Sequence, residues 1–309
     1  MCIRDRVLGV RGVGAERVPG VATPLERSGR SLPLVEALRF LLPTRTVPVT
    51  GAARRVRTLW EILGLRRATL SIGWWGSWPA EPEAGGGAWV VSDRVLPKLL
   101  SGAEWERDSW PPQLFETLEG GFEELVSTAR TAFEALPVAD LDSETRERVW
   151  ESFLIDAFGL QTAESLWLRG DFDSAFVYLP GLDIRRQRFS SAADPLPMLA
   201  RARLLEAYTA WLDRRIGALL RAVGPGATAV LLADPGRAAG DTAEGVLAIR
   251  GTGAAAGCIE PPAGRRSVAA VLLALAGFPG SAEIAPYEGG GCLEAVFRDA
   301  ATIPTYGLR

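Results

Sequence analysis

The chain has 309 residues with 48% hydrophobic and 23% charged side chains, so it is long and apolar enough to bury a sizeable core. Its net charge of −3 argues against a protein that binds nucleic acid through a broad basic face. It contains no histidine, which removes the commonest metal ligand among protein side chains. No apolar run approaches the ~18–20 residues that a membrane span needs.

The three cysteines, Cys2, Cys258 and Cys292, are isolated, so no cysteine zinc site is expected. Cys258 and Cys292 either pair in an oxidising compartment or remain buried free thiols. Residues 1–6 (MCIRDR) lack the apolar stretch of a secretion signal and resemble translated adapter sequence at the ends of gene fragments. We therefore expect that residues preceding Val7 are missing, which leaves the compartment open. The richness in glycine, alanine and arginine indicates a GC-rich bacterial genome.

Taken in chain order, the hydrophobic pattern predicts an α/β protein. Residues 1–50 look irregular apart from one short apolar helix. Beyond them, apolar residues recur at helical spacing, and short apolar runs bounded by glycine and proline mark strands. The predicted helices cover residues 34–42, 52–65, 114–136, 143–169, 195–223 and 268–276. The predicted strands cover residues 69–74, 88–92, 175–179, 227–233 and 246–249, of which 175–179 reads as a buried parallel strand.

Two carboxylates follow continuous apolar strands. Asp183 comes after the strand at 175–179, and Asp234 comes directly after the strand at 227–233. Ligands of open α/β sheets bind outside the carboxyl ends of the strands, so these side chains share one site if the two strands are neighbours. Paired Asp oxygens favour a divalent metal. The alternative is that each Asp only caps a turn beside glycine and proline.

Several segments resemble motifs of the type I phosphodiesterase/nucleotide pyrophosphatase family in the alkaline phosphatase superfamily. Residues 176–183 (FVYLPGLD) resemble its "YLPGLDxxxH", and residues 230–236 (VLLADPG) resemble its "LLSDHG". Residues 73–81 (GWWGSWPAE) and 91–94 (VSDR) resemble "GWWATWPAE" and "VSDR" of a bacterial branch. Tyr208, Trp211, Leu212 and Asp213 fit its "YxxxLD" helix, and residues 266–279 resemble "DIAPTLLALLGLP". The resemblance spans roughly residues 50–309.

The resemblance implies an alkaline-phosphatase-like α/β domain over residues 51–309, with a mainly parallel central sheet flanked by helices. A helical insertion would occupy about residues 95–170, and residues 1–50 would be a truncated part of the domain. Family members bind two divalent ions, usually zinc, which activate a Thr or Ser nucleophile. We cannot match that nucleophile to any residue of this chain.

The chain departs from the family pattern at the metal ligands. Asp183 and Asp234 are kept, but Gln187 and Pro235 stand where the family has histidine. We align Asp241 with the third histidine. A Gln amide oxygen is a poor zinc ligand, and proline has no donor atom in its side chain. A paired zinc site of the usual kind therefore cannot form.

Three interpretations remain open. The first is a non-catalytic relative with a decayed metal site and no cofactor, which still binds a phosphate-bearing small molecule or a protein partner. The second is an active phosphoesterase in which Asp183, Asp234 and Asp241 or Glu244 hold Mg or Mn, with its nucleophile in missing upstream sequence. The third is a structural or partner-binding module without a ligand, in which Trp74, Trp75 and Trp78 belong to the core or contact a partner.

The arginines around Gln187 also have two interpretations. Arg185, Arg186 and Arg188 attract an anion, since arginine suits phosphate, or form a solvated turn.

Overall fold

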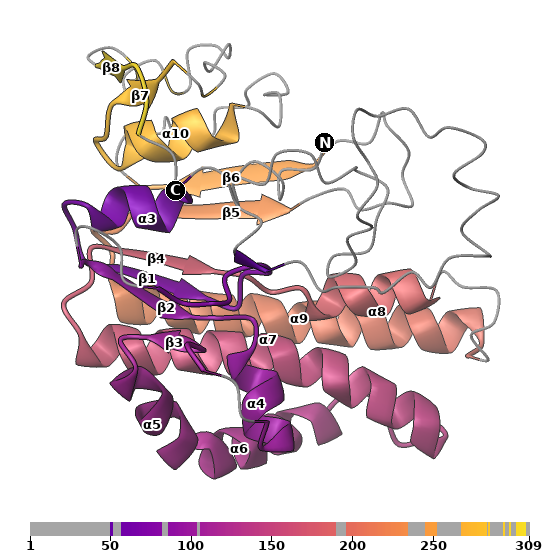
Figure 1. The fold of residues 1–309 in the computed structure, drawn as a ribbon. Helices are drawn as coiled ribbons and strands as arrows, with labels where there is room; N and C mark the ends of the chain where they lie inside the picture. The colour runs from indigo at the N-terminus through magenta and orange to yellow at the C-terminus, as the bar shows by residue number, and fades with distance from the viewer. Residues whose placement is uncertain are drawn as a thin grey trace, which may run out of the picture.

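The fold is a three-layered α/β arrangement in a computed structural model (Figure 1). The structure describes 50–51, 57–81, 86–103, 106–189, 196–233, 245–251, 267–282, 301–306, Ile284, Leu293 and Phe297, with backbone alone at 187–188. The segment 1–50, expected to be a truncated part of the domain, therefore lies outside the described residues except for its last residue.

The middle layer is a four-stranded sheet in the order β3-β2-β1-β4. Its central strand β1 (Thr69–Ile72) runs parallel to β2 (Ala88–Val91) and to β4 (Ser174–Val177). The short strand β3 (Ser109–Trp110) adds to β2 in the antiparallel sense. All four residues of β1 are buried, as expected for a strand covered on both faces. The prediction of an α/β protein with a mainly parallel sheet is confirmed at this level.

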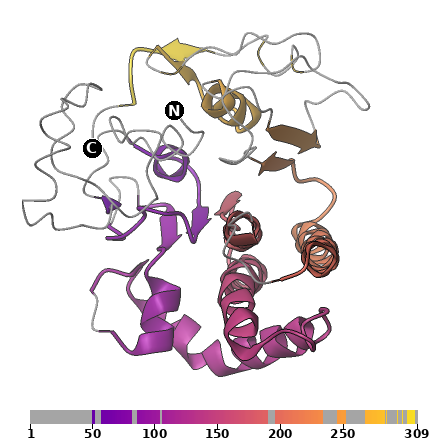
Figure 2. The same cartoon turned by 90° about the vertical axis from the view of Figure 1, so that its right-hand side faces the viewer.

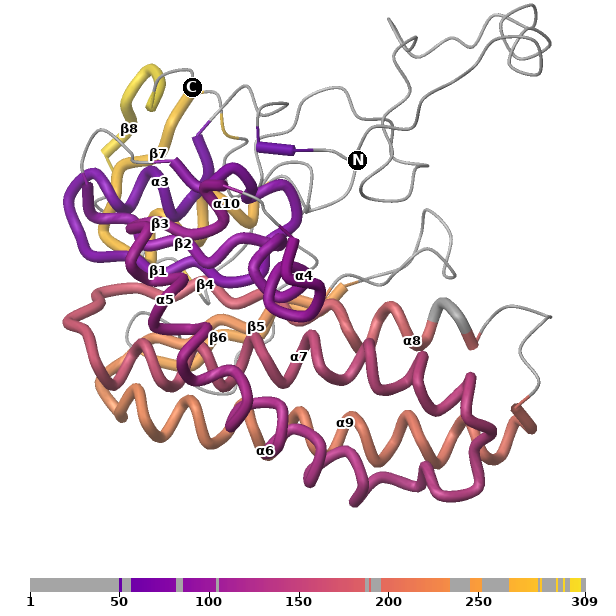
Figure 3. The backbone as a smooth tube through the Cα atoms, turned by 60° about the horizontal axis from the view of Figure 1, so that its bottom comes forward, coloured from indigo at the N-terminus to yellow at the C-terminus, as the bar shows by residue number. Residues whose placement is uncertain are grey.

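Long helices cover one face of the sheet, below it in Figure 1. The helix α7 (Ser143–Arg169) contacts β1 and β4, and α9 (Met198–Val223) packs beside it, as Figure 3 shows. The bounds of α7 agree with the prediction because Asp142 gives a clear start, where its carboxylate accepts the N–H of Thr145 at 2.9 Å. The helix α8 (Gly181–Phe189) packs against both long helices.

The other face carries α3 (Leu59–Gly64) and α10 (Val268–Leu275), which share one apolar cluster. The start of α3 is fixed by a capping box, in which Thr58 and Glu61 each accept the other's backbone N–H. Every residue of α3 is buried between the sheet and α10. The sheet therefore has a helical layer on each side.

The remaining elements lie around this core. Between β2 and β4 the chain forms α4, α5 and α6 together with β3 and α7, while the two small sheets follow α9. Their bounds are Val95–Ser101 for α4, Gln113–Gly120 for α5, Phe122–Glu134 for α6, Ala229–Ala233 for β5, Val246–Arg250 for β6, Gly280–Ser281 for β7 and Thr302–Ile303 for β8. It stays a prediction that residues of about 95–170 form a helical insertion within the domain.

Three expectations differ from the structure. The predicted helix over 114–136 is two helices, because Gly120 and Gly121 interrupt it. The predicted buried strand over 175–179 is β4, which lies at the edge of the sheet among the described residues, and Ala175 in it is exposed. The predicted turn after that strand contains α8. Among the described helices, none combines the length and apolar character that crossing a bilayer requires.

Candidate functional site

Three turns meet at the carboxyl edge of the sheet. They follow β1, β2 and β4 and cover residues 73–80, 92–94 and 178–183, which we call the carboxyl edge. The three strands are parallel, so their carboxyl ends lie on the same side of the sheet. This is the usual ligand position in open α/β sheets. The motifs that carry the family resemblance in this part of the chain fall in these turns.

Asp93 holds the tryptophan-rich turn in place. Its carboxylate accepts the backbone N–H groups of Gly76 and Trp78, both at 3.2 Å, and its own N–H donates to Ser77 Oγ at 3.1 Å. Gly76 has a φ of +73°, a conformation that side chains other than glycine rarely adopt. The aspartate of the "VSDR" segment therefore stabilises the turn formed by the "GWWGSWPAE" segment through hydrogen bonds.

Burial raises the pKa of the Asp93 carboxyl, although the N–H groups of Gly76 and Trp78 and the positive charge of Arg94 favour its ionised form. Desolvation is the larger effect. Both oxygens of the Asp93 carboxylate accept hydrogen bonds from the turn after β1. These oxygens therefore serve the structure of the turn, at the edge of the sheet where a ligand would bind.

Replacing Asp93 with alanine is expected to destabilise the protein by about 2–3 kcal/mol, because two partly buried backbone N–H groups lose their acceptor. Asp93→Asn is the matched control, since its amide oxygen still accepts one of them, and it should lose about half as much. Urea unfolding followed by tryptophan fluorescence measures both. Equal stability of the alanine variant and the parent chain would show that the turn does not depend on this carboxylate.

A second buried carboxylate holds the turn after β4. Asp156 lies in the middle of α7 and accepts the backbone N–H groups of Gly181 at 2.7 Å and Leu182 at 3.0 Å. Tyr208 of α9 donates its hydroxyl proton toward Asp156 Oδ2 at 2.8 Å and toward the carbonyl oxygen of Ser152 at 3.0 Å. One carboxylate thus joins α7, α8 and α9, and it satisfies the first two N–H groups of α8.

Burial also dominates the ionisation of this group. Desolvation raises the pKa of Asp156 to about 6, against the hydrogen bonds from Gly181, Tyr208 and Leu182 that favour the ionised form. Burial and the neighbouring Asp156 raise the pKa of Tyr208, which keeps its hydroxyl protonated as a donor. The three residues Asp156, Tyr208 and Gly181 form a buried polar cluster that positions the start of α8.

The aromatic side chains of the carboxyl edge pack mainly on one another. The Trp74 ring contacts Trp60, at a centroid distance of 5.7 Å, and Tyr178, which is stacked on it at 5.1 Å. Trp75 meets the edge of Tyr178 at 5.5 Å. Trp74 also packs against the apolar clusters around α3 and β2. Trp74 is therefore in contact with two of the protein's own rings, which favours a role in the core for this tryptophan.

The predicted site residues are only partly described. Asp183 is the third residue of α8 and is half-buried. Asp234, Pro235 and Asp241 lie outside the described residues, and the side chain of Gln187 does as well. The part of the chain that is described contains no group of three or more His, Cys, Asp or Glu side chains that could hold a metal ion.

The strand that precedes Asp234 does not pair with the strand that precedes Asp183. In the described residues β5 pairs with β6 in a separate antiparallel sheet, and β4 pairs with β1. The neighbouring strands assumed for a shared site are therefore not hydrogen-bonded to each other. In the same region Arg185 is buried within α8, with its guanidinium 4.0 Å from the ring centroid of Phe189, so the interpretation as a solvated turn is wrong for this arginine.

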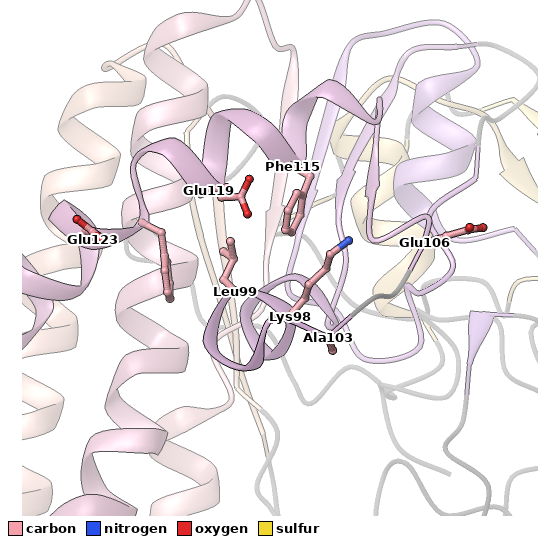
Figure 4. A pocket seen from close by; sticks show the side chains of 9 residues that line it. Lys98, Leu99, Ala103, Glu106, Phe115, Glu119 and Glu123 are labelled. Carbon is pink, nitrogen blue, oxygen red and sulfur yellow. The ribbon is translucent and has the colours of Figure 1, made fainter.

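A cavity of about 580 Å³ lies elsewhere, between the end of α4, α5 and the start of α6 (Figure 4). Lys98, the one cation among the described lining residues, donates to Asp108 Oδ2 at 2.7 Å and lies 4.2 Å from the ring centroid of Phe115. Glu106 and Glu123 lie at opposite ends of the cavity in Figure 4. No motif of the sequence analysis contributes to it. The lining residues are Lys98, Leu99, Gly102, Ala103, Glu106, Phe115, Glu119, Phe122 and Glu123.

Sequence reasoning missed Asp156, although a signal for it exists. It stands within the run Phe153-Leu154-Ile155-Asp156-Ala157-Phe158, where an acidic residue among apolar residues of a buried helix requires a buried partner. Tyr208 was noted only as part of a helix motif. The partners of Asp156 are 25 and 52 residues away in sequence, so the local pattern does not identify them.

Comparison of the chain with protein-family models, with curated proteins and with solved structures finds no match.

Proposed function

We propose that this protein is a catalytically inactive relative of metal-dependent phosphodiesterases and nucleotide pyrophosphatases, with a decayed metal site. The proposal rests on the resemblance of the motifs to that family and on the positions where this chain lacks the metal-binding histidines of the family. Gln187 and Pro235 replace histidine ligands, and Asp241 is aligned with the third. A chain without any imidazole cannot supply the nitrogen ligands that the paired zinc site of the resembled family uses.

The observation that carries the proposal is how the carboxyl edge uses its own polar groups. Phosphate sites at such edges consist of backbone N–H groups that point at the ligand. Here the carboxylate of Asp156 accepts the first two N–H groups of α8, and Asp93 accepts two N–H groups of the turn after β1. Donors that would hold a phosphoryl group are thus engaged with internal carboxylates, which supports a structural use of this edge.

The remaining charge at the same edge also supports the proposal. Asp183 adds a third carboxylate in the first turn of α8. An anionic phosphodiester would approach Asp93, Asp156 and Asp183 without the divalent ions that offset such charge in the resembled enzymes. The groups of this edge are therefore suited to holding turns together and poorly suited to stabilising a phosphoryl transition state.

The test is metal analysis of the purified protein together with hydrolysis of a nitrophenyl phosphodiester in Zn, Mn and Mg. The expected result is no turnover above the buffer rate and less than one equivalent of bound metal. Turnover that depends on Mg or Mn would contradict the proposal and support a carboxylate site formed by Asp183, Asp234 and Asp241 or Glu244. The control is a variant in which all four are replaced with Asn or Gln, which removes that turnover only if the carboxylates hold the metal.

A ligand titration separates the two non-catalytic alternatives. A saturable rise in melting temperature with inorganic phosphate or a nucleotide supports a relative that still binds phosphate-bearing molecules. No rise at millimolar concentrations leaves a structural or partner-binding module, which the packing of Trp74 against Trp60 and Tyr178 also favours.

Restoring the family ligands tests the decay itself. The variant Gln187→His, Pro235→His and Asp241→His is expected to gain zinc binding that the parent chain lacks, because it adds three imidazoles beside two kept carboxylates. The matched control places the same histidines at exposed helix positions, for example at Glu116, Glu123 and Glu147. Equal zinc binding by both variants would show that the three positions do not form a site.

A further inference from the structure

The cavity between α4, α5 and α6 has a floor of apolar side chains. Leu99, Phe115 and Phe122 line it and also pack against the main apolar core, so their positions are held from the inner side. In Figures 1 and 2 these helices lie below the sheet, whereas α10 lies above it. None of the described residues of the carboxyl edge lines this cavity. Its volume of about 580 Å³ is in the range of sites for small molecules.

Three glutamates surround the apolar floor. Glu106 and Glu123 lie at the two ends of the cavity, and Glu119 lies between them (Figure 4). All three side chains are exposed, and among the described residues none of them forms an ion pair. A hollow lined by charges of one sign concentrates ions of the opposite sign. The cavity is therefore suited to a cation.

Lys98 does not reverse this charge. Its ammonium group donates to Asp108 at 2.7 Å, and the side chain of Asp108 is only 3% exposed. The other carboxylate oxygen of Asp108, Oδ1, has no hydrogen-bond partner, so the buried acid next to Lys98 still has an unused acceptor. Because Asp108 matches the positive charge of Lys98, the three glutamates set the charge of the cavity. A phosphate or another anion would meet this excess of carboxylates.

The floor and the spacing of the acids favour an organic cation over a metal ion. Lys98 already lies 4.2 Å from the ring centroid of Phe115, so a cation fits against the aromatic surface here. In the part of the chain that is described, the glutamates do not converge into a group of three that could hold a metal ion. An elongated molecule with a positive charge at each end meets the separated carboxylates and the apolar floor together.

We propose that this cavity binds a linear aliphatic diamine or polyamine. The terminal ammonium groups lie against Glu106 and Glu123, and the methylene chain crosses Phe115 and Phe122. An inner ammonium group of a longer polyamine meets Glu119. The binding uses no residue of the phosphodiesterase motifs, so it is independent of the proposed decay of the metal site.

Isothermal titration calorimetry of the full chain at low ionic strength is the first test. Spermidine is expected to bind saturably to one site with a dissociation constant below about 1 mM. The diamine 1,5-diaminopentane is expected to bind about three- to fivefold more tightly than n-pentylamine, because the monoamine leaves the carboxylate at one end without a partner. Equal affinity of these two amines, or no saturable binding of spermidine up to about 10 mM, overturns the proposal.

Two matched pairs of charge variants locate the binding. Glu119→Gln with Glu123→Gln removes two carboxylates that line the cavity, and Glu116→Gln with Glu124→Gln removes two from the same helices outside its lining. All four side chains are exposed, so both pairs are expected to fold like the parent chain, which urea unfolding checks.

The cavity pair is expected to weaken spermidine binding by about tenfold and the outer pair by less than about twofold. Equal weakening by both pairs would mean that spermidine associates with the acidic surface of α5 and α6 as a whole, and it would overturn the site.

Discussion

Replacing Gly181 with alanine is expected to destabilise the protein by about 3 kcal/mol or more. A Cβ atom at this position would lie 2.0 Å from the carbonyl oxygen of Ser152, 2.6 Å from Tyr208 Oη and 2.8 Å from Asp156 Cγ. The nearest atom belongs to the backbone of α7 and cannot move aside without distorting that helix. Relief requires α8 to shift, and the shift breaks the hydrogen bonds that Asp156 accepts.

The matched control is Gly217→Ala in the interior of α9. The nearest atom to a Cβ there is the end of the flexible Arg221 side chain at 3.5 Å, so the methyl group fits. Alanine is expected to stabilise the helix by about 0.5–1 kcal/mol, since glycine costs backbone entropy in a helix interior. Chemical denaturation measures both variants. Equal stabilities of the two would show that the contact between α7 and the start of α8 is looser than the distances indicate.

Local sequence was sufficient wherever an element carries its own signals. The helix α7 was predicted with its observed bounds because Asp142 caps its start, and the strands β1 and β2 followed from apolar runs bounded by glycine. The strand β3 was not predicted, since two residues on a sheet edge leave no periodic pattern. Asp183 was expected just past the end of a parallel strand, and it lies in α8 after the parallel strand β4, whereas the strand before Asp234 pairs with β6 in the antiparallel sense.

Long-range contacts explain what the sequence did not predict. Pro180 and Gly181 read as a turn, but α8 begins there because a carboxylate from α7 accepts its first N–H groups. The apolar run of β4 predicts full burial, but burial depends on a partner strand, and β5 pairs with β6 instead. Of the predicted site carboxylates only Asp183 is described, so the shared site remains a prediction.

The buried cluster around Asp156 leads to the second large effect. The contribution of Asp156 to the free energy of unfolding rises as the solution becomes acidic. The pKa of Asp156 is raised to about 6 in the folded chain from an ordinary 3.8, because burial disfavours its charge. The folded state therefore binds the proton more tightly than the unfolded state between these values. The stabilising contribution is fully present below about pH 3.8 and is lost as the pH rises through about 6, with a size of about 3 kcal/mol from the 1.36 kcal/mol per pKa unit.

Other carboxylates act in the opposite direction, so the effect of Asp156 must be measured as a difference. Hydrogen bonds from Thr145 lower the pKa of Asp142. The contribution of Asp142 to the stability of the folded protein is therefore lost on acidification. The matched variant is Asp156→Asn, which keeps an oxygen acceptor for Gly181 and removes the ionisable group. We expect the variant to be at least as stable as the parent chain at pH 8, where the parent buries a charge. At pH 4.5 the free energy of unfolding of the variant is expected to be lower relative to that of the parent than at pH 8.

Urea unfolding of both chains between pH 4.5 and pH 8 gives the difference directly. Asp156→Ala separates charge from hydrogen bonding, because it leaves the N–H groups of Gly181 and Leu182 without an acceptor. It is expected to be less stable than Asp156→Asn by about 1–3 kcal/mol at every pH, since neither variant ionises at this position. A parent-minus-Asn difference that is flat from pH 4.5 to pH 8 would mean that Asp156 ionises as an exposed carboxyl does. In that case the start of α8 is open to water, and the internal carboxylates no longer argue against anion binding at the carboxyl edge.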